Sequence, residues 1–161
     1  MKRLILVRHG KSSWEHDVID HERPLKERGF SDGNLVSTAY KEAHENPEVI
    51  WTSDAKRALT TAVIFKETLK MSDEKFIEKH KLYTFDGRDL KQIIKGCEDH
   101  INSLMVFGHN HAMTDVANAL GDKAIDNVPT TGLTIIDFDV ERWTQIKHGK
   151  TIATIFPKDL K

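Results

Sequence analysis

The stretch LILVRHGKSSW, residues 4–14, decides how the rest of the chain is interpreted. Its first four residues form an apolar, partly β-branched run that is typical of a buried strand. The run then stops at Arg8 and His9. Gly10 follows, and glycine allows a positive φ or a close backbone approach to a ligand. An arginine and a histidine side by side at the end of a buried strand indicate a loop that takes part in binding or catalysis.

Length and composition predict one globular domain over residues 1–161. Hydrophobic residues make up 39% of the chain, and the formal net charge is -1. With charges so nearly balanced, we expect neither nucleic acid nor a membrane as a partner. The apolar runs are too short for a bilayer span or a signal peptide, so we expect a cytoplasmic protein. Cys97 is the single cysteine, which excludes an internal disulfide.

The hydrophobic pattern alternates between strands and helices. It predicts strands at residues 2–7, 48–52, 103–107 and 133–138, and helices at residues 27–45, 55–70, 88–96 and 111–120. Such alternation favours an α/β fold with three layers, α/β/α, around a mostly parallel central sheet. Residues 131–156 instead resemble strands joined by short turns near residues 141–142 and 148–149. We therefore expect an antiparallel C-terminal edge.

Ligands of parallel sheets bind outside the carboxyl ends of the strands. Three predicted strands end at chemically useful residues: Arg8 and His9 after the first, Ser53 and Arg57 after the second, and His109 after the third. Taken singly, each has a structural explanation, such as a strand-end arginine that reaches water. Arg57, however, falls at a helix N-terminus, where the helix dipole disfavours a cation unless an anion also binds there. Together these residues predict an anion site.

The same residues resemble a known family. The segments LVRHG (residues 6–10), SDAKRA (53–58) and GH (108–109) are similar in order and context to the motifs of the histidine phosphatase superfamily, also called phosphoglycerate mutase-like. The segments GKSSW (10–14), RPLKERG (23–29), GHN (108–110) and PTTG (129–132) resemble its small SixA-like phosphohistidine phosphatase branch. The resemblance extends from residue 4 to about residue 157.

The resemblance implies roles for four residues. His9 would be the nucleophile, while Arg8, Arg57 and His109 would hold the phosphoryl group. Guanidinium groups suit the geometry of phosphate, and a neutral histidine whose other ring nitrogen donates to a backbone carbonyl is able to attack phosphorus. Water would then hydrolyse the phosphohistidine intermediate. Because arginines take the place of metal ions in such a site, we expect no metal and no cofactor.

We also expect six further residues in the phosphate pocket or on its rim: Gly10, Lys11, Ser12, Arg23, Ser53 and Asn110. Lys11 would add positive potential, or be an exposed loop lysine. Ser12 would donate to phosphate, or shape the turn. Arg23 would contact substrate, or pair with Asp20 or Glu22, and Trp14 would join the rim or pack on the surface.

The proton donor is the open part of the site. Phosphoglycerate mutases have a glutamate where this chain has Lys11, and the acid phosphatase branch has an aspartate where it has Asn110. The middle segment offers only Asp86. An ester leaving group needs an acid, whereas the imidazole of phosphohistidine can be protonated beforehand. The short distance in sequence from Arg57 to His109 also predicts that no cap insertion encloses the site.

These arguments favour a metal-independent phosphatase that acts on phosphohistidine in a protein. Two alternatives remain. One is a phosphatase of small phosphate esters or anhydrides, and the other is a non-catalytic module that binds phosphate or phosphoproteins. The presence of His9 argues against the non-catalytic binding module, because a phosphate-binding site needs the arginines more than it needs a nucleophile.

Overall fold

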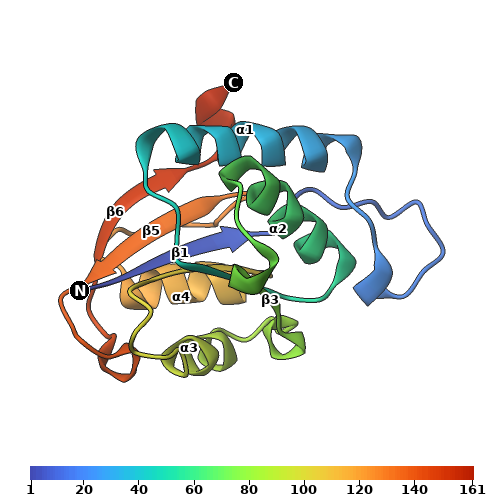
Figure 1. Ribbon diagram of the computed structural model, residues 1–161. Coiled ribbons are helices and arrows are strands. Elements are labelled where there is room, and N and C mark those ends of the chain that lie inside the picture. Colours follow the sequence, from blue (N-terminus) through green and yellow to red (C-terminus); the bar gives the residue numbers. More distant parts are fainter.

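The computed structural model describes residues 1–161 and has one six-stranded sheet with helices on both faces (Figure 1). The strands lie in the order β3-β2-β4-β1-β5-β6. Strands β1 to β4 are mutually parallel where they pair, whereas β5 runs antiparallel to both β1 and β6. The strand bounds are β1 Lys2–Arg8, β2 Val49–Thr52, β3 Phe76–Glu78, β4 Ser103–Gly108, β5 Leu133–Phe138 and β6 Lys150–Ile155. The α/β fold and its antiparallel C-terminal edge are as predicted.

Four α-helices form the outer layers. On one face, α1 (Glu27–Ala43) packs against α2 (Lys56–Leu69), and on the other α3 (Gly87–Lys95) packs against α4 (Ala112–Leu120) (Figure 1). Short 3-10 turns complete the chain: η1 Asp20–Glu22, η2 Asp73–Lys75, η3 His80–Leu82, η4 Trp143–Gln145 and η5 Pro157–Leu160. No helix combines the length and the apolar character that crossing a membrane requires.

All four predicted strands and all four predicted helices are present, with ends that shift by one or two residues. Strand β3 was not predicted, because it is only three residues long and its side chains are mostly exposed. The C-terminal segment also differs from expectation, since β5 and β6 are joined by η4 rather than by a third strand. Trp143 of η4 is fully buried and donates its indole N–H to the carbonyl of Ile101 (2.7 Å), so its burial shapes the connection.

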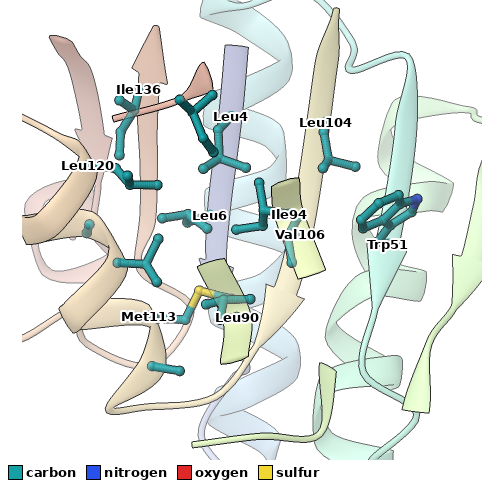
Figure 2. Close-up of a cluster of buried hydrophobic side chains, with 14 of the residues drawn as sticks. Leu4, Leu6, Trp51, Leu90, Ile94, Leu104, Val106, Met113, Leu120 and Ile136 are labelled. Atoms are coloured by element: carbon teal, nitrogen blue, oxygen red, sulfur yellow. The ribbon is translucent and has the colours of Figure 1, made fainter. Parts of the chain in front are cut away.

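The core has two parts, one on each face of the sheet. Figure 2 shows the larger part, in which Leu4 and Leu6 of β1 face Leu90 of α3 and Met113 of α4. Ile5 and Val7, which alternate with Leu4 and Leu6 along β1, belong to the smaller part, beneath α1 and α2. Burial on both faces explains why the first strand reads as a continuous apolar run.

The parallel pairing of β1, β4 and β2 places their carboxyl ends at one edge of the sheet. Arg8 pairs with Gly108 across β1 and β4, and Thr52 pairs with Phe107 across β2 and β4. The residues that follow these strands therefore emerge side by side.

Candidate active site

The structure brings the two histidines together at this edge. The ring centroids of His9 and His109 lie 5.3 Å apart, and the residues are only 8% and 1% exposed. Arg57, near the start of α2, is 2% exposed, and Arg8 is half-buried. Four residues from three separate segments of the chain thus converge, as the strand-end argument predicts.

His9 has the arrangement of a nucleophile. Its Nδ1 lies 2.7 Å from the carbonyl oxygen of Gly10, which fixes the proton on that nitrogen and leaves the lone pair on Nε2. Burial, opposed by the bond to the Gly10 carbonyl and helped by the positive charges of Arg57 and Arg8, lowers the pKa of His9 to about 3. The imidazole is therefore neutral near pH 7, as attack on phosphorus requires.

His109 is held from the opposite side by Ser53. Its Nε2 lies 2.9 Å from the hydroxyl oxygen of Ser53, a residue with no exposed surface. Burial, followed by the neighbouring His9, lowers the pKa of His109 to about 3. His109 is thus neutral near pH 7 in this structure, and a nearby bound anion would favour its protonation.

The two arginines each keep one buried donor without a hydrogen-bond partner. Arg8 donates from Nη1 to the carbonyl of Val128 (2.9 Å), and burial lowers the pKa of its guanidinium. Three buried nitrogens have no hydrogen-bond partner: Arg8 Nε, Arg57 Nε and His109 Nδ1. Buried polar groups are nearly always paired, so three at one place indicate a ligand that accepts hydrogen bonds. An oxyanion such as phosphate has the required oxygens.

Asp20 completes the site, and sequence reasoning placed it only as a partner of Arg23. Arg57 donates to the Asp20 carbonyl (2.7 Å) and to its carboxylate (3.0 Å), and the Tyr83 hydroxyl donates to the same carboxylate. Burial pushes the pKa of Asp20 upward, but the bonds from Tyr83, Arg57 and Arg23 outweigh it and hold that pKa far below its ordinary value. The pocket thus contains an anion of the chain itself.

Arg23 and Ser12 line the rim together. Arg23 is buried, donates to the Ser12 hydroxyl (2.7 Å) and to Asp20 (3.1 Å), and stacks its guanidinium 3.5 Å from the ring centre of Trp14. The ion pair with Asp20 considered from the sequence is therefore present. Trp14 is 75% exposed, whereas Lys11 is half-exposed and uses its backbone carbonyl to accept from Lys26 N–H (2.8 Å).

Of the two reasons that the sequence offers for Gly10, a positive φ is wrong, while close approach to a ligand stays a prediction. The φ of Gly10 is not positive. A Cβ at this position would lie 3.2 Å from the carbonyl oxygen of Gly29, and the Gly10 N–H donates to the hydroxyl of Thr61 (2.9 Å). The absent side chain therefore lets the loop pack against the first turn of α1.

Two polar residues that the sequence suggests for the site, Asn110 and Asp86, use their side chains in hydrogen bonds at the start of a helix. The side-chain oxygen of Asn110 accepts from the backbone N–H and the hydroxyl of Thr114 in α4. The Asp86 carboxylate accepts from Arg88 N–H (2.7 Å) as the N-cap of α3. At the start of α2, Ala55 occupies the N-cap position and makes no side-chain bond.

Comparisons with known proteins agree with this geometry. Residues 4–83 match the family model "Histidine phosphatase superfamily (branch 1)". An uncharacterized chloroplast protein of Arabidopsis thaliana is 31% identical over 140 residues, which cover 77% of this chain and 61% of that protein. The chain thus spans about three fifths of the length of this relative. An uncharacterized protein of Mycobacterium tuberculosis is 22% identical over 89% of this chain and 93% of its own length.

Solved structures share the whole fold. The protein histidine phosphatase SixA complexed with tungstate superposes with a TM-score of 0.84 at 17% identity and covers 99% of both chains. A SixA protein from Agrobacterium tumefaciens gives a TM-score of 0.81 at 21% identity and covers 96% of this chain and 97% of its own. The strand-end motifs, the convergent site and the family match lead to one assignment. The chain belongs to the histidine phosphatase superfamily and has the same fold as the SixA structures.

Proposed function

We propose that this chain is a metal-independent phosphatase that hydrolyses phosphohistidine on proteins through a covalent intermediate on His9, in the cytoplasm. In this proposal residues 1–161 act as one catalytic domain without a cap insertion. One observation carries it: His9 has Nδ1 bonded to the Gly10 carbonyl and Nε2 available, with the ring of His109 5.3 Å away.

The proposed reaction has two displacement steps. Arg8, Arg57 and His109 bind the phosphoryl oxygens, and His9 Nε2 attacks phosphorus in line with the leaving group. The P–N bond of the substrate breaks as the new P–N bond to His9 forms, and the departing imidazole leaves with the proton it already carries. Water then attacks the phosphorus on His9, phosphate departs, and the neutral His9 is restored.

The absence of a free acid supports phosphohistidine as the substrate. The Asp86 carboxylate is engaged as the N-cap of α3, and Asp20 is held ionised by Tyr83, Arg57 and Arg23. Neither is arranged to protonate an alkoxide. A phosphoramidate does not need that help, because its imidazole is already protonated when it leaves. SixA, which is described as a protein histidine phosphatase, shares the fold and supports the same substrate class.

The rim supports a substrate carried by another protein. Trp14 and Phe85 are large apolar side chains that remain exposed, and the Phe85 ring lies 5.4 Å from that of His109. Exposed aromatic residues beside a buried nucleophile favour contact with a partner surface.

A small ester is the second proposal, since one observation favours it. Mycobacterial glucosyl-3-phosphoglycerate phosphatase has the same fold, with a TM-score of 0.69 at 13% identity over 94% of this chain and 97% of its own. A substrate panel separates the two classes.

The experiment is phosphate release in excess chelator from a phosphohistidine protein, an aryl phosphate and a sugar phosphate. Wild type is compared with His9→Ala and with the control His148→Ala. The His148 side chain is exposed, and the residue lies far from His9 in the sequence. We expect the fastest release from phosphohistidine, retained in His148→Ala and lost in His9→Ala. Faster release from the sugar phosphate would favour the second proposal. Phosphate binding without any turnover would favour the binding module.

A further inference from the structure

A second cluster of side chains lies beside the catalytic pocket. It contains His21 of η1, Asp54 between β2 and α2, and His80 of η3. His21 Nε2 lies 2.9 Å from Asp54 Oδ1, and His80 Nδ1 lies 3.0 Å from both carboxylate oxygens. One ligand atom from each residue lies within 4.8 Å of the others. Three segments distant in sequence thus direct two imidazoles at one carboxylate.

The hydrogen bonding of His21 is informative. Its second ring nitrogen, Nδ1, lies 3.1 Å from a carboxylate oxygen of Glu22. Both ring nitrogens therefore face carboxylates, but a neutral imidazole carries only one proton. In either neutral tautomer, one nitrogen lone pair faces an oxygen lone pair. Either an extra proton or a cation must lie between them.

We propose that His21, Asp54 and His80 bind a divalent transition-metal ion, with Zn²⁺ as the best match. Two imidazole nitrogens and one carboxylate oxygen are ligands that zinc accepts, with a fourth position left for water. Glu22 then has the place of the outer carboxylate that usually orients a metal-bound histidine.

The geometry is close to what zinc requires. Tetrahedral ligands at about 2.0–2.1 Å from the metal lie roughly 3.3 Å from one another. The donor atoms at up to 4.8 Å need only small side-chain movements to reach that spacing. His80 can supply such movement because its side chain is 74% exposed, while Asp54 and His21 are anchored at 28% and 27% exposure.

The position of this metal site links it to the catalytic pocket. His21 is adjacent in sequence to Asp20, which bonds Arg57. The His21 ring also lies 5.0 Å from that of Tyr83, which in turn lies 5.3 Å from that of His109. A metal ion at His21 would fasten η1 to η3 and to the turn before α2. It would thereby hold Asp20 against Arg57, where phosphate has to bind.

In this proposal the bound metal regulates the enzyme. The regulation, unlike the metal binding itself, rests on the proposed phosphatase function. Zn²⁺ would compete with the substrate by stabilising the Asp20–Arg57 contact. It would not touch the reacting atoms, so phosphate release in excess chelator is retained.

The test begins with metal binding alone, in the full chain without a histidine tag. Calorimetric titration of ZnCl₂ into wild type is compared with His80→Ala, Asp54→Asn and the control His100→Ala. His100 is a matched control because its side chain is 73% exposed and pairs with one carboxylate, Glu98, at 3.2 Å. We expect one site in wild type and in His100→Ala. In the other two variants the affinity should be lower by at least about 10–100-fold, because loss of even an outer partner of a metal ligand costs that much.

Binding that is equal in wild type and His80→Ala, or no binding in wild type, would overturn the metal site. The latter result would mean that a proton bridges His21 and Asp54. His80 is exposed, so circular dichroism of His80→Ala is expected to match wild type and to exclude misfolding as the cause.

A second measurement tests the regulatory link with initial rates on an aryl phosphate. Zn²⁺ is expected to raise the apparent KM of wild type severalfold with kcat unchanged, and to have no such effect on His80→Ala. Zinc binding without a change in KM would overturn regulation but leave the metal site. An enzyme with no turnover at all would refute the proposed function, while the calorimetric result would still decide the metal site.

Discussion

The Asp20 carboxylate lies 3.0 Å from Nη2 of Arg57, so an anion of the chain already contacts the guanidinium that we propose for phosphate binding. Arg57 is also held by the backbone carbonyl of Asp20 at 2.7 Å. The backbone contact does not depend on the carboxylate charge. The charge of Asp20 and the position of Arg57 can therefore be separated by mutation.

Asp20→Asn is expected to bind inorganic phosphate severalfold more tightly than wild type. The variant removes the negative charge that competes with phosphate for Arg57, but keeps the carbonyl that positions the guanidinium. Calorimetric titration with phosphate measures the effect, and Asp17→Asn, an exposed aspartate in the same loop, is the control. Weaker binding in Asp20→Asn would show that the carboxylate orients Arg57 instead of competing with phosphate.

Arg57→Lys is expected to lower kcat/KM by about 100-fold, even though the charge is retained. A lysine offers a point charge without the planar donor fork, and loss of one preorganised donor typically costs about 10²–10³ in rate. Arg88→Lys, whose side chain is 94% exposed, is the matched control and should behave as wild type. Steady-state kinetics on an aryl phosphate measure kcat/KM. If Arg57→Lys is as active as wild type, the paired donors of the guanidinium are not needed for the reaction.

Ser53→Ala is expected to lower the free energy of unfolding by about 1–3 kcal/mol, because a buried nitrogen of His109 loses its partner. Activity should fall as well, since the imidazole is no longer fixed. Chemical denaturation measures the first effect and kinetics the second. Ser31→Ala, at an exposed position in α1, should change neither. Unchanged stability in Ser53→Ala would mean that the hydroxyl does not hold His109.

Stability is expected to fall as the pH is lowered from about 6.5 towards 3. His9 and His109 have pKa values of about 3 in the folded chain, whereas an unfolded histidine titrates near 6.5. Between these values the unfolded chain binds more protons, so acid favours unfolding and the stabilising effect is complete above pH 6.5. His9→Asn should show a shallower decline in denaturation experiments, while His148→Asn should follow wild type. Identical slopes in wild type and His9→Asn would contradict the low pKa of His9.

The sequence predicts the sheet, and the convergence of Arg8, His9, Arg57 and His109, because both depend on local patterns. The apolar run of β1 is buried on both faces, and parallel pairing necessarily brings the loop at His9 next to the loop at His109. Strand β3 could not be predicted in this way, since three mostly exposed residues carry no periodicity.

Side-chain pairing across loops was beyond sequence reasoning. The sequence suggests Asp20 only as a partner of its neighbour Arg23, yet Asp20 also bonds Arg57 and Tyr83 from distant segments. The same applies to the cluster of His21, Asp54 and His80, because no motif spacing joins residues in three separate turns. Asn110 shows the opposite problem: its place after His109 suggests the pocket, but its side chain bonds α4.

The central claim is that His9 carries the phosphoryl group during turnover. The most direct measurement mixes the enzyme rapidly with a ³²P-labelled phosphohistidine protein, stops the reaction in alkali, where phosphohistidine survives, and locates the label by peptide mapping. We predict a transient label on His9 in wild type and neither label nor phosphate release in His9→Ala. A label on another residue, or phosphate release that continues in His9→Ala, would contradict the account.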